Sequence, residues 1–279
     1  MTQAPTSAVD TARNYYNSSD ADTFYFTIWG GENIHIGLYA TPDEAIAEAS
    51  QRTVERMSAR LQTLNPSAKV LDLGAGYGGS MRHLARTVGC RCVALNLSEV
   101  ENARDRAMNR EQGLDRLIEV VEGDFAHLPF PDASFEVVWS QDAILHSGER
   151  DRVIAEIARV LKSGGEFVFT DPMQADDCPQ NVLQPILDRI HLDSLGSPGF
   201  YRQQARKVGL AELSYESHSE QLTAHYTRVL QELQHRAAEV LAAGISQGYS
   251  DRMQKGLQHW IEGGRKGYLA WGIFHFRKP

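Results

Sequence analysis

The chain has 279 residues, and its 42% hydrophobic and 23% charged content is ordinary for a water-soluble globular protein. It carries 36 acidic and 28 basic residues, and the net charge of −8 argues against a nucleic-acid partner, which would require a basic face. Its three cysteines, Cys90, Cys92 and Cys178, fit neither a disulfide framework nor a metal-ligand spacing, and no apolar run is long enough to span a bilayer. We therefore expect a cytoplasmic enzyme that acts on a small molecule, without a metal or a membrane, as a monomer or a homodimer.

Residues 1–64 are predicted to form a mostly helical lid ahead of the main domain. Within the lid, residues 41–44 (Thr-Pro-Asp-Glu) form a capping box with proline at the first helical position, which predicts that a helix begins there. Apolar residues at helical spacing follow, namely Ile46, Val54, Met57 and Leu61.

From residue 65 to 279, short β-rich runs alternate with amphipathic helical patterns. Strands are predicted at residues 70–73, 91–96, 117–121, 135–140, 166–170, 212–216 and 270–277. Helices are predicted after Gly79, between Ser98 and Gly113, and at residues 150–161, 200–208, 225–245 and 251–262. This alternation predicts an α/β fold with a Rossmann-like sheet of seven mostly parallel strands, covered by helices on both faces. Residues 174–198 are too long for a plain loop and are predicted to form an inserted cap after the fifth strand.

A glycine-rich segment lies between the first predicted strand and the helix that follows it. Its spacing, Asp72-x-Gly74-x-Gly76-x-Gly78, differs from the G-x-G-x-x-G of dinucleotide-binding proteins. Glycines at such a turn let the backbone approach a ligand closely. The segment resembles motif I of the class I S-adenosylmethionine methyltransferases, and this resemblance implies that Asp72, Gly74, Ala75 and Gly76 bind the cofactor.

Three further segments resemble the same family, in the same order along the chain. Gly123-Asp124-Phe125 follows the third strand, residues 128–138 (LPFPDASFEVV) lead into the fourth, and residues 161–165 (LKSGG) precede the fifth. The resemblance implies that Asp124 accepts a hydrogen bond from the adenine amino group and that Phe125 packs on the ring.

The second strand departs from the family pattern, which places there an acid that binds both ribose hydroxyls. Asn96 stands at that position, and its amide can still hydrogen-bond the ribose. Asn96, Leu97 and Gln141 complete the implied cofactor site.

Longer segments narrow the resemblance to one subgroup. Residues 24–39 (FYFTIWGGENIHIGLY), 95–102 (LNLSEVEN), 140–147 (SQDAILHS) and 171–173 (DPM) are similar to the sarcosine/dimethylglycine N-methyltransferases, over essentially the whole chain. The resemblance implies methyl transfer from S-adenosylmethionine to sarcosine and/or N,N-dimethylglycine, which yields the osmoprotectant glycine betaine and S-adenosylhomocysteine.

The substrate and catalytic residues are assigned from what this chemistry needs. The product is a quaternary ammonium, and aromatic faces stabilise such a charge, so the lid aromatics Tyr15, Tyr16, Tyr25, Trp29 and Tyr39 are candidates. Arg202, Gln141 and Asn181 are candidate partners for the substrate carboxylate. His146 and His35 are candidate bases, with water as an alternative, and Tyr25 is a further catalytic candidate. Pro172 and Met173 are expected to shape the amine pocket.

Two other functions fit the same motifs. One is a C- or O-methyltransferase of the sterol, tocopherol or prenyl type, which would need a wider and more apolar pocket. The other is a protein that binds S-adenosylmethionine without catalysing a reaction.

Overall fold

The computed structural model describes residue 13 and residues 17–279, which are built around one seven-stranded sheet. The strands lie in the order β3-β2-β1-β4-β5-β9-β7. Neighbours from β3 through β5 are parallel, and β9 is antiparallel to both β5 and β7. This arrangement confirms the expected Rossmann-like, mostly parallel sheet. The strands are β1 (Lys69–Leu73), β2 (Arg91–Asn96), β3 (Ile118–Glu122), β4 (Phe135–Gln141), β5 (Leu161–Thr170), β7 (Ala211–Ser217) and β9 (Gly272–Arg277).

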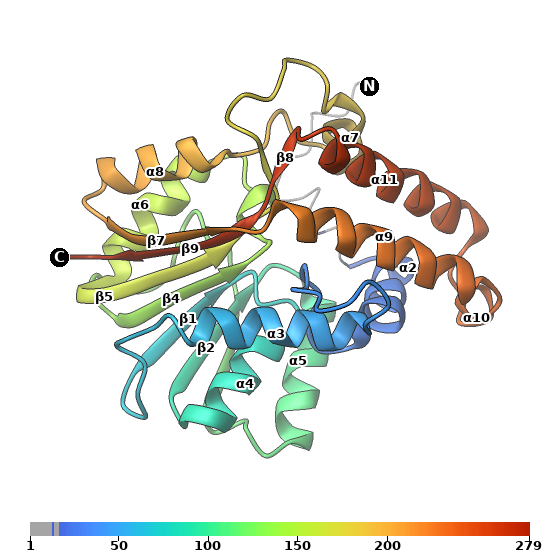
Figure 1. Cartoon of the computed structure of the whole chain (residues 1–279). Helices are drawn as coiled ribbons and strands as arrows, with labels where there is room; N and C mark the ends of the chain where they lie inside the picture. Colours follow the sequence, from blue (N-terminus) through green and yellow to red (C-terminus); the bar gives the residue numbers. More distant parts are fainter. Residues whose placement is uncertain (1–12, 14–16) are drawn as a thin grey trace, which may run out of the picture.

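Helices cover both faces of this sheet, as expected (Figure 1). On one face, side chains of α3 and α4, such as Met57 and Leu84, form a core with Val70 and Trp139. On the other face, Ile157 of α6 and other helix residues form a second core with the opposite side of the strands. The helices beside the sheet are α3 (Ile46–Ser58), α4 (Gly79–Val88), α5 (Glu99–Glu111), α6 (Arg150–Val160) and α8 (Pro198–Lys207).

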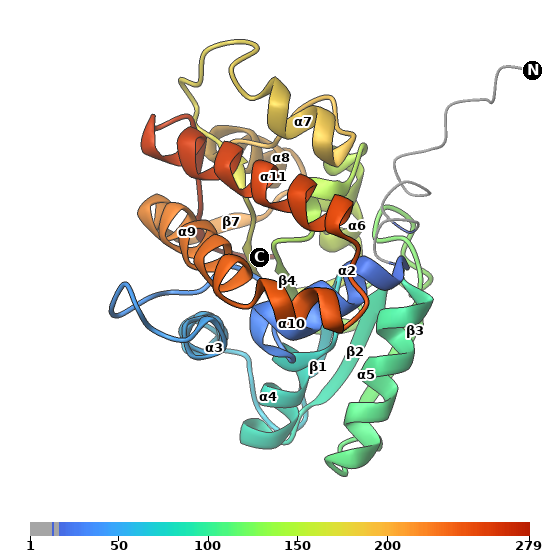
Figure 2. The same ribbon diagram turned by 90° about the vertical axis from the view of Figure 1, so that its right-hand side faces the viewer.

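A separate layer of helices forms a cap beyond the carboxyl ends of the strands (Figure 2). Phe24 and Trp29 from the N-terminal part pack against Val229, Tyr249 and Leu257 from the C-terminal part in one apolar cluster. The cap is therefore built from both ends of the chain. Its elements are α2 (Ser19–Phe24), the π-helical turn η1 (Tyr25–Gly30), α7 (Gln184–Ile190), α9 (Ser219–His235), α10 (Ala237–Ala242) and α11 (Gln247–Arg265). Two short strands, β6 (Met173–Gln174) and β8 (Leu269–Ala270), pair at the junction of cap and sheet.

Several predicted helix bounds differ from the structure: the helix expected from residue 225 begins at Ser219, and the one expected at 251–262 spans Gln247–Arg265. Two differences have a visible cause. The helix expected at residue 41 begins at Ile46, because Glu44 does not cap it but accepts a hydrogen bond from Ala40 N (2.8 Å) and pairs with Arg52. The helix expected over residues 225–245 is broken at Arg236, whose guanidinium donates to the Thr27 carbonyl oxygen (2.7 Å). The division at residue 64 stays a prediction, although α3 joins the two parts: its Met57 packs in the core on the sheet, and its Ile46 packs in the apolar cluster of the cap.

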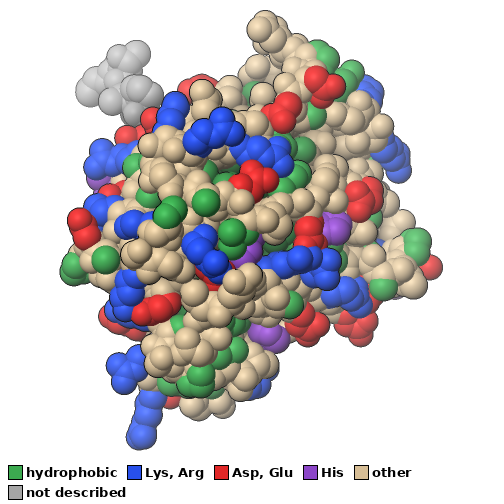
Figure 3. Space-filling view, turned by 60° about the vertical axis from the view of Figure 1, so that its left-hand side comes forward, with side chains coloured by type: hydrophobic (Ala, Val, Ile, Leu, Met, Phe, Trp, Pro, Cys, Tyr) green, Lys and Arg blue, Asp and Glu red, His purple; other side chains and the backbone are tan. Residues whose placement is uncertain are grey.

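Charges of both signs are interspersed over the face of the molecule that Figure 3 displays. That face shows no continuous basic stripe of the kind that binds a phosphate backbone. Within the described part of the chain, no helix combines the length and the apolar character needed to cross a membrane.

Candidate functional site

Two adjoining cavities open at the carboxyl edge of the sheet, where parallel α/β proteins bind their ligands. The first, here called the glycine-loop cavity, has a volume of about 320 Å³. Gly74 and Gly76 line it with φ angles of +77° and +55°, a conformation that favours glycine. Of the nine predicted cofactor residues, seven line this cavity, namely Gly74, Gly76, Asn96, Leu97, Asp124, Phe125 and Gln141. Asp72 and Ala75 line neither cavity.

A carboxylate lies near Asn96, the residue that replaces the acid of the family pattern, and the sequence did not predict it. Asn96 Nδ2 donates to Glu101 Oε2 (2.7 Å), and Glu101 lines the same cavity from the first turn of α5. Ser98 and Glu101 have the spacing of a capping box, of which only one half forms: Ser98 Oγ accepts from the Glu101 amide (3.1 Å), while the Glu101 carboxylate faces Asn96. Burial raises the pKa of Glu101 to about 7. Glu101 therefore places a buried carboxylate next to the end of β2.

Asp124 keeps acceptor capacity for a ligand. Its Oδ1 accepts from the Ala126 amide (2.8 Å), and its Oδ2 lies 3.0 Å from His127 Nδ1. A carboxylate has about four lone-pair positions, so each oxygen can accept a further hydrogen bond. The apolar ring of Phe125 lines the cavity beside it.

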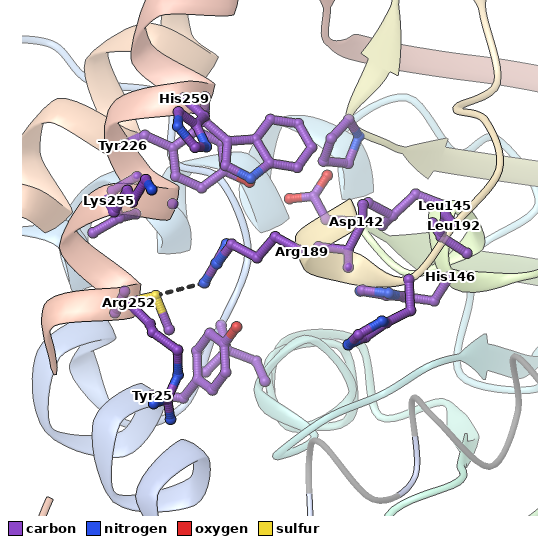
Figure 4. Close-up of a pocket in the computed structure, with 18 of the residues that line it drawn as sticks. Tyr25, Asp142, Leu145, His146, Arg189, Leu192, Tyr226, Arg252, Lys255 and His259 are labelled. Atoms are coloured by element: carbon purple, nitrogen blue, oxygen red, sulfur yellow. Dashed lines mark hydrogen bonds between the residues drawn. The ribbon is translucent and has the colours of Figure 1, made fainter. Parts of the chain in front are cut away.

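The second cavity, here called the aromatic cavity, has a volume of about 1260 Å³ and lies under the cap (Figure 4). The π-helical turn η1 brings the rings of Tyr25 and Trp29 to a centroid distance of 5.2 Å, and both line the cavity. Helices α9 and α11 add aromatic and charged groups to its wall. They include Tyr226, Tyr249, Arg252, Lys255, His259 and Trp260.

The two cavities share three lining residues, Ile34, Asp142 and His146. Asp142 is half-buried and adopts the left-handed conformation (φ 51°), and its carboxylate accepts from Ile36 N (2.7 Å) and Trp271 Nε1 (2.8 Å). Burial raises the pKa of Asp142 to about 6. Burial, together with the charge of Arg150, lowers the pKa of His146 to about 4. At neutral pH the junction therefore holds a carboxylate and an uncharged imidazole.

His35 lines the aromatic cavity, but its hydrogen bonds restrict what it can do. The Trp139 indole N–H only donates, so Gln141 Oε1 must face it (2.9 Å), and Gln141 Nε2 then donates to His35 Nδ1 (3.1 Å). The Nδ1 lone pair is thus occupied, and burial lowers the pKa of His35 to about 3. This arrangement favours a positioning role for His35 over that of a base.

Four predicted substrate residues do not line either cavity. Tyr39 instead places its hydroxyl 2.9 Å from His225 Nδ1, and Met173 is buried in the core beneath the sheet's edge. Arg202 is held by Glu212 (2.9 Å) and lies over the Tyr215 ring. Asn181 is an exposed turn residue. By contrast, Tyr25, Trp29, His146 and Pro172 line the aromatic cavity, and Gln141 lines the glycine-loop cavity. Tyr15 and Tyr16 lie outside the described residues.

Three residues that line the cavities were not predicted as site residues from the sequence: Glu101, Asp142 and Arg189. Asp142 immediately follows β4, and its place at the carboxyl end of a strand was the one signal that could have identified it. Arg189 comes from α7, inside the predicted inserted cap. Among the described residues, no group of three or more His, Cys, Asp or Glu side chains is arranged to hold a metal ion.

Comparisons with known proteins agree with this architecture. A family model for a methyltransferase domain matches residues 71–169. The chain is 60% identical to a sarcosine/dimethylglycine N-methyltransferase from Halorhodospira halochloris over 97% of each protein. It is 55% identical to a sarcosine/dimethylglycine N-methyltransferase from Aphanothece halophytica over 96% of each.

A solved structure extends the comparison to the whole fold. The crystal structure of a protein assigned as a sarcosine dimethylglycine methyltransferase from Galdieria sulphuraria is 45% identical to the chain, with a TM-score of 0.90. The match covers 95% of this chain and 98% of that one. From its full-length sequence similarity and its fold, the chain belongs to the family of sarcosine/dimethylglycine N-methyltransferases.

Proposed function

We propose that the chain transfers a methyl group from S-adenosylmethionine to the nitrogen of sarcosine and/or N,N-dimethylglycine. Methylation of dimethylglycine yields glycine betaine. The observation that supports this most is the junction of the two cavities at Asp142 and His146, because a donor in one cavity and an amine in the other would meet there.

The residues of the glycine-loop cavity fit S-adenosylmethionine. The methionine part would lie against the backbone at Gly74 and Gly76. The Asn96–Glu101 pair would bind the ribose hydroxyls, and Asp124 and Phe125 would bind the adenine. The bound cofactor would supply a methyl group activated by a sulfonium. This chain's own task is then to bind, orient and deprotonate the amine.

The junction suits an amine that begins as a cation and must expose its lone pair. The Asp142 carboxylate attracts the ammonium group, and the faces of Tyr25 and Trp29 line the space where positive charge remains on nitrogen in the product. The new N–C bond forms as the S–C bond breaks, with that electron pair staying on sulfur. Before this step the ammonium proton passes to water. The neutral His146 imidazole accepts a hydrogen bond from the ammonium but does not hold the proton, because its pKa of about 4 makes it a weak base.

The aromatic cavity is large enough for a prenyl-type substrate, but its wall also carries several charged side chains. It contains Asp142, Asp188, Arg189, Arg252 and Lys255 as well as the aromatic rings. A charged wall fits a zwitterionic amino acid better than a prenyl chain, because burying a charge against hydrocarbon is costly.

A labelled-methyl assay tests the proposed function. The purified chain is incubated with methyl-labelled S-adenosylmethionine and glycine, sarcosine or dimethylglycine, and the products are separated by chromatography. We expect label in dimethylglycine, in glycine betaine, or in both. Binding of the cofactor without labelling of any of the three amines would favour the prenyl-type or the non-catalytic alternative instead.

Replacing Glu101 by glutamine should weaken S-adenosylmethionine binding about tenfold at pH 8, because charge-assisted hydrogen bonds to the ribose are lost. Since the pKa of Glu101 is about 7, the affinity of the unaltered chain should rise from pH 6 to pH 8, while that of the variant should stay flat. Calorimetry measures both. Glu99→Gln is the control, because Glu99 is exposed on the same helix and lines neither cavity. Equal affinities of all three proteins would exclude the ribose role.

A further inference from the structure

Two guanidiniums that line the aromatic cavity, those of Arg189 and Arg252, have no carboxylate partner among the described residues. Arg189 is half-buried on α7, and its Nη2 donates to the Met253 sulfur, which is a weak acceptor (2.9 Å). It joins none of the ion pairs formed among the described residues. In Figure 4 its side chain extends across the cavity from α7 toward α11, between the labelled Tyr226 and Tyr25. The cavity therefore contains the Arg189 guanidinium, most of whose N–H donors are available to a ligand.

Helix α11 has a glycine, Gly256, at the position where the Arg189 side chain packs against it. A Cβ atom added at Gly256 would lie 2.2 Å from Arg189 Nε and 2.5 Å from its Cζ, so the guanidinium lies directly against the bare helix backbone. Glycine inside a helix costs about 1 kcal/mol relative to alanine. Gly256 thus keeps space for Arg189 at a position where alanine would make the more stable helix.

The other cations of the cavity are less suited to anchoring a ligand. Arg252 and Lys255 lie on the exposed side of α11, where water screens their charge. The half-buried Arg189 shares the cavity wall with Asp142, so a less exposed positive group and a negative group line the same space. This charge pattern complements a small zwitterion.

We propose that Arg189 binds the carboxylate of the amino-acid substrate while Asp142 attracts its amine. The inference rests on the proposed function and deepens it, because it names the group that selects for a carboxylate-bearing amine. A guanidinium can grip a carboxylate through two parallel hydrogen bonds, which also fixes the direction of the amine. Gly256 is a positioning residue that acts through Arg189.

Steady-state kinetics of Arg189→Met tests the inference. We expect the KM for dimethylglycine to rise about 30-fold with much less change in kcat, as for a lost charged hydrogen-bonding partner. Binding of 2-(dimethylamino)ethanol, which has a hydroxyl in place of the carboxylate, should not weaken in calorimetry on the protein loaded with S-adenosylhomocysteine. Arg202→Met is the matched control, because Arg202 is paired with Glu212 outside both cavities and should leave the KM unchanged.

Two further variants keep the test decisive if Arg189→Met folds poorly. Arg189→Lys retains the positive charge but not the paired N–H donors of the guanidinium. Its KM should lie between those of the unaltered chain and Arg189→Met. Gly256→Ala should raise the KM in the unaltered chain but add nothing in the Arg189→Met background, since both changes remove the same interaction.

The possible failures are distinguishable. An unaltered chain that methylates dimethylglycine, with an Arg189→Met KM equal to its own, would overturn the inference and leave the proposed function standing. Equal weakening of dimethylglycine and 2-(dimethylamino)ethanol would also overturn it, because that result indicates a general structural role. An unaltered chain that neither binds nor methylates an amine with a carboxylate would overturn both.

Discussion

Replacing Asp142 by asparagine is expected to lower kcat/KM for dimethylglycine about 100-fold, because it removes the half-buried charge that we propose faces the cationic amine. Asparagine keeps the size of the side chain and one acceptor oxygen, so part of the contact with Ile36 N and Trp271 Nε1 can persist. The affinity for S-adenosylmethionine should change little, since Asp142 is not among the groups proposed to hold the cofactor. Steady-state kinetics and calorimetry measure the two quantities.

The pH dependence gives this prediction a second readout. Burial raises the pKa of Asp142 to about 6, so its carboxylate becomes protonated and uncharged as the pH falls below that value. The kcat/KM profile reports the free enzyme, and it should therefore decline below about pH 6 in the unaltered chain. In Asp142→Asn that inflection should be absent.

Asp171→Asn is the matched control for loss of a buried acid. Asp171 is fully buried, and its pKa, like that of Asp142, is raised, here to about 7. It accepts from the Tyr201 hydroxyl and Leu145 N, but it lines neither cavity. If this variant loses activity as strongly as Asp142→Asn while staying folded, the specific role of Asp142 at the junction is refuted.

The second large effect concerns stability. Glu166, at 0% exposure on β5, accepts hydrogen bonds at both carboxylate oxygens, and Glu166→Gln should lower the free energy of unfolding by about 3 to 5 kcal/mol at pH 7. Its partners are Gln62 N (2.8 Å), Thr63 N (2.7 Å), Thr63 Oγ1 (2.6 Å), His275 Nε2 (3.0 Å) and Arg277 Nη2 (2.9 Å). Glutamine would present an NH₂ group to donors that need an acceptor. Denaturant unfolding measures the change.

The sign of its pH dependence follows from the same contacts. Burial alone would raise the pKa of Glu166, but the hydrogen bonds from His275, Thr63 and Arg277 outweigh it and lower the pKa from 4.5 to about 2. A carboxyl with a lowered pKa contributes stability above its unfolded value and loses it as the pH falls toward its folded value. The stability difference between the unaltered chain and Glu166→Gln should thus be constant above about pH 5 and shrink below pH 4.5.

Glu136→Gln, on the neighbouring strand β4, is the control, because Glu136 is partly exposed and should cost less. A difference in unfolding free energy between the unaltered chain and Glu166→Gln that stays the same from pH 7 to pH 3 would contradict the assignment.

The parts of the fold that could be predicted are those whose signals lie close together in the sequence. Strand β2 was predicted at its observed bounds, and the glycine loop was placed because the Asp72-to-Gly78 spacing is a local pattern. The domain division and the roles of individual site residues remain predictions.

The cap and its site could not be predicted, because their contacts join distant segments. Asp142 accepts hydrogen bonds from Ile36 and Trp271, and Arg189 contacts α11 at Met253 and Gly256. No spacing rule links residues so far apart along the chain.

Local geometry explains the substrate residues that were misplaced. Pro172 and Met173 are neighbours in extended chain, where successive side chains point to opposite sides, so Pro172 lines the aromatic cavity while Met173 enters the core. Tyr39 and Arg202 instead form hydrogen bonds with His225 and Glu212, respectively. A residue's type indicates what it can bind, but only the fold determines which partner reaches it.

The most direct test of the central claim is a crystal structure of the chain with S-adenosylhomocysteine and dimethylglycine bound together. We expect the thioether in the glycine-loop cavity, the amine nitrogen at the junction beside Asp142 and His146, and the substrate carboxylate on Arg189. Dimethylglycine bound away from this junction, with its nitrogen facing neither Asp142 nor the cofactor's sulfur, would contradict that claim.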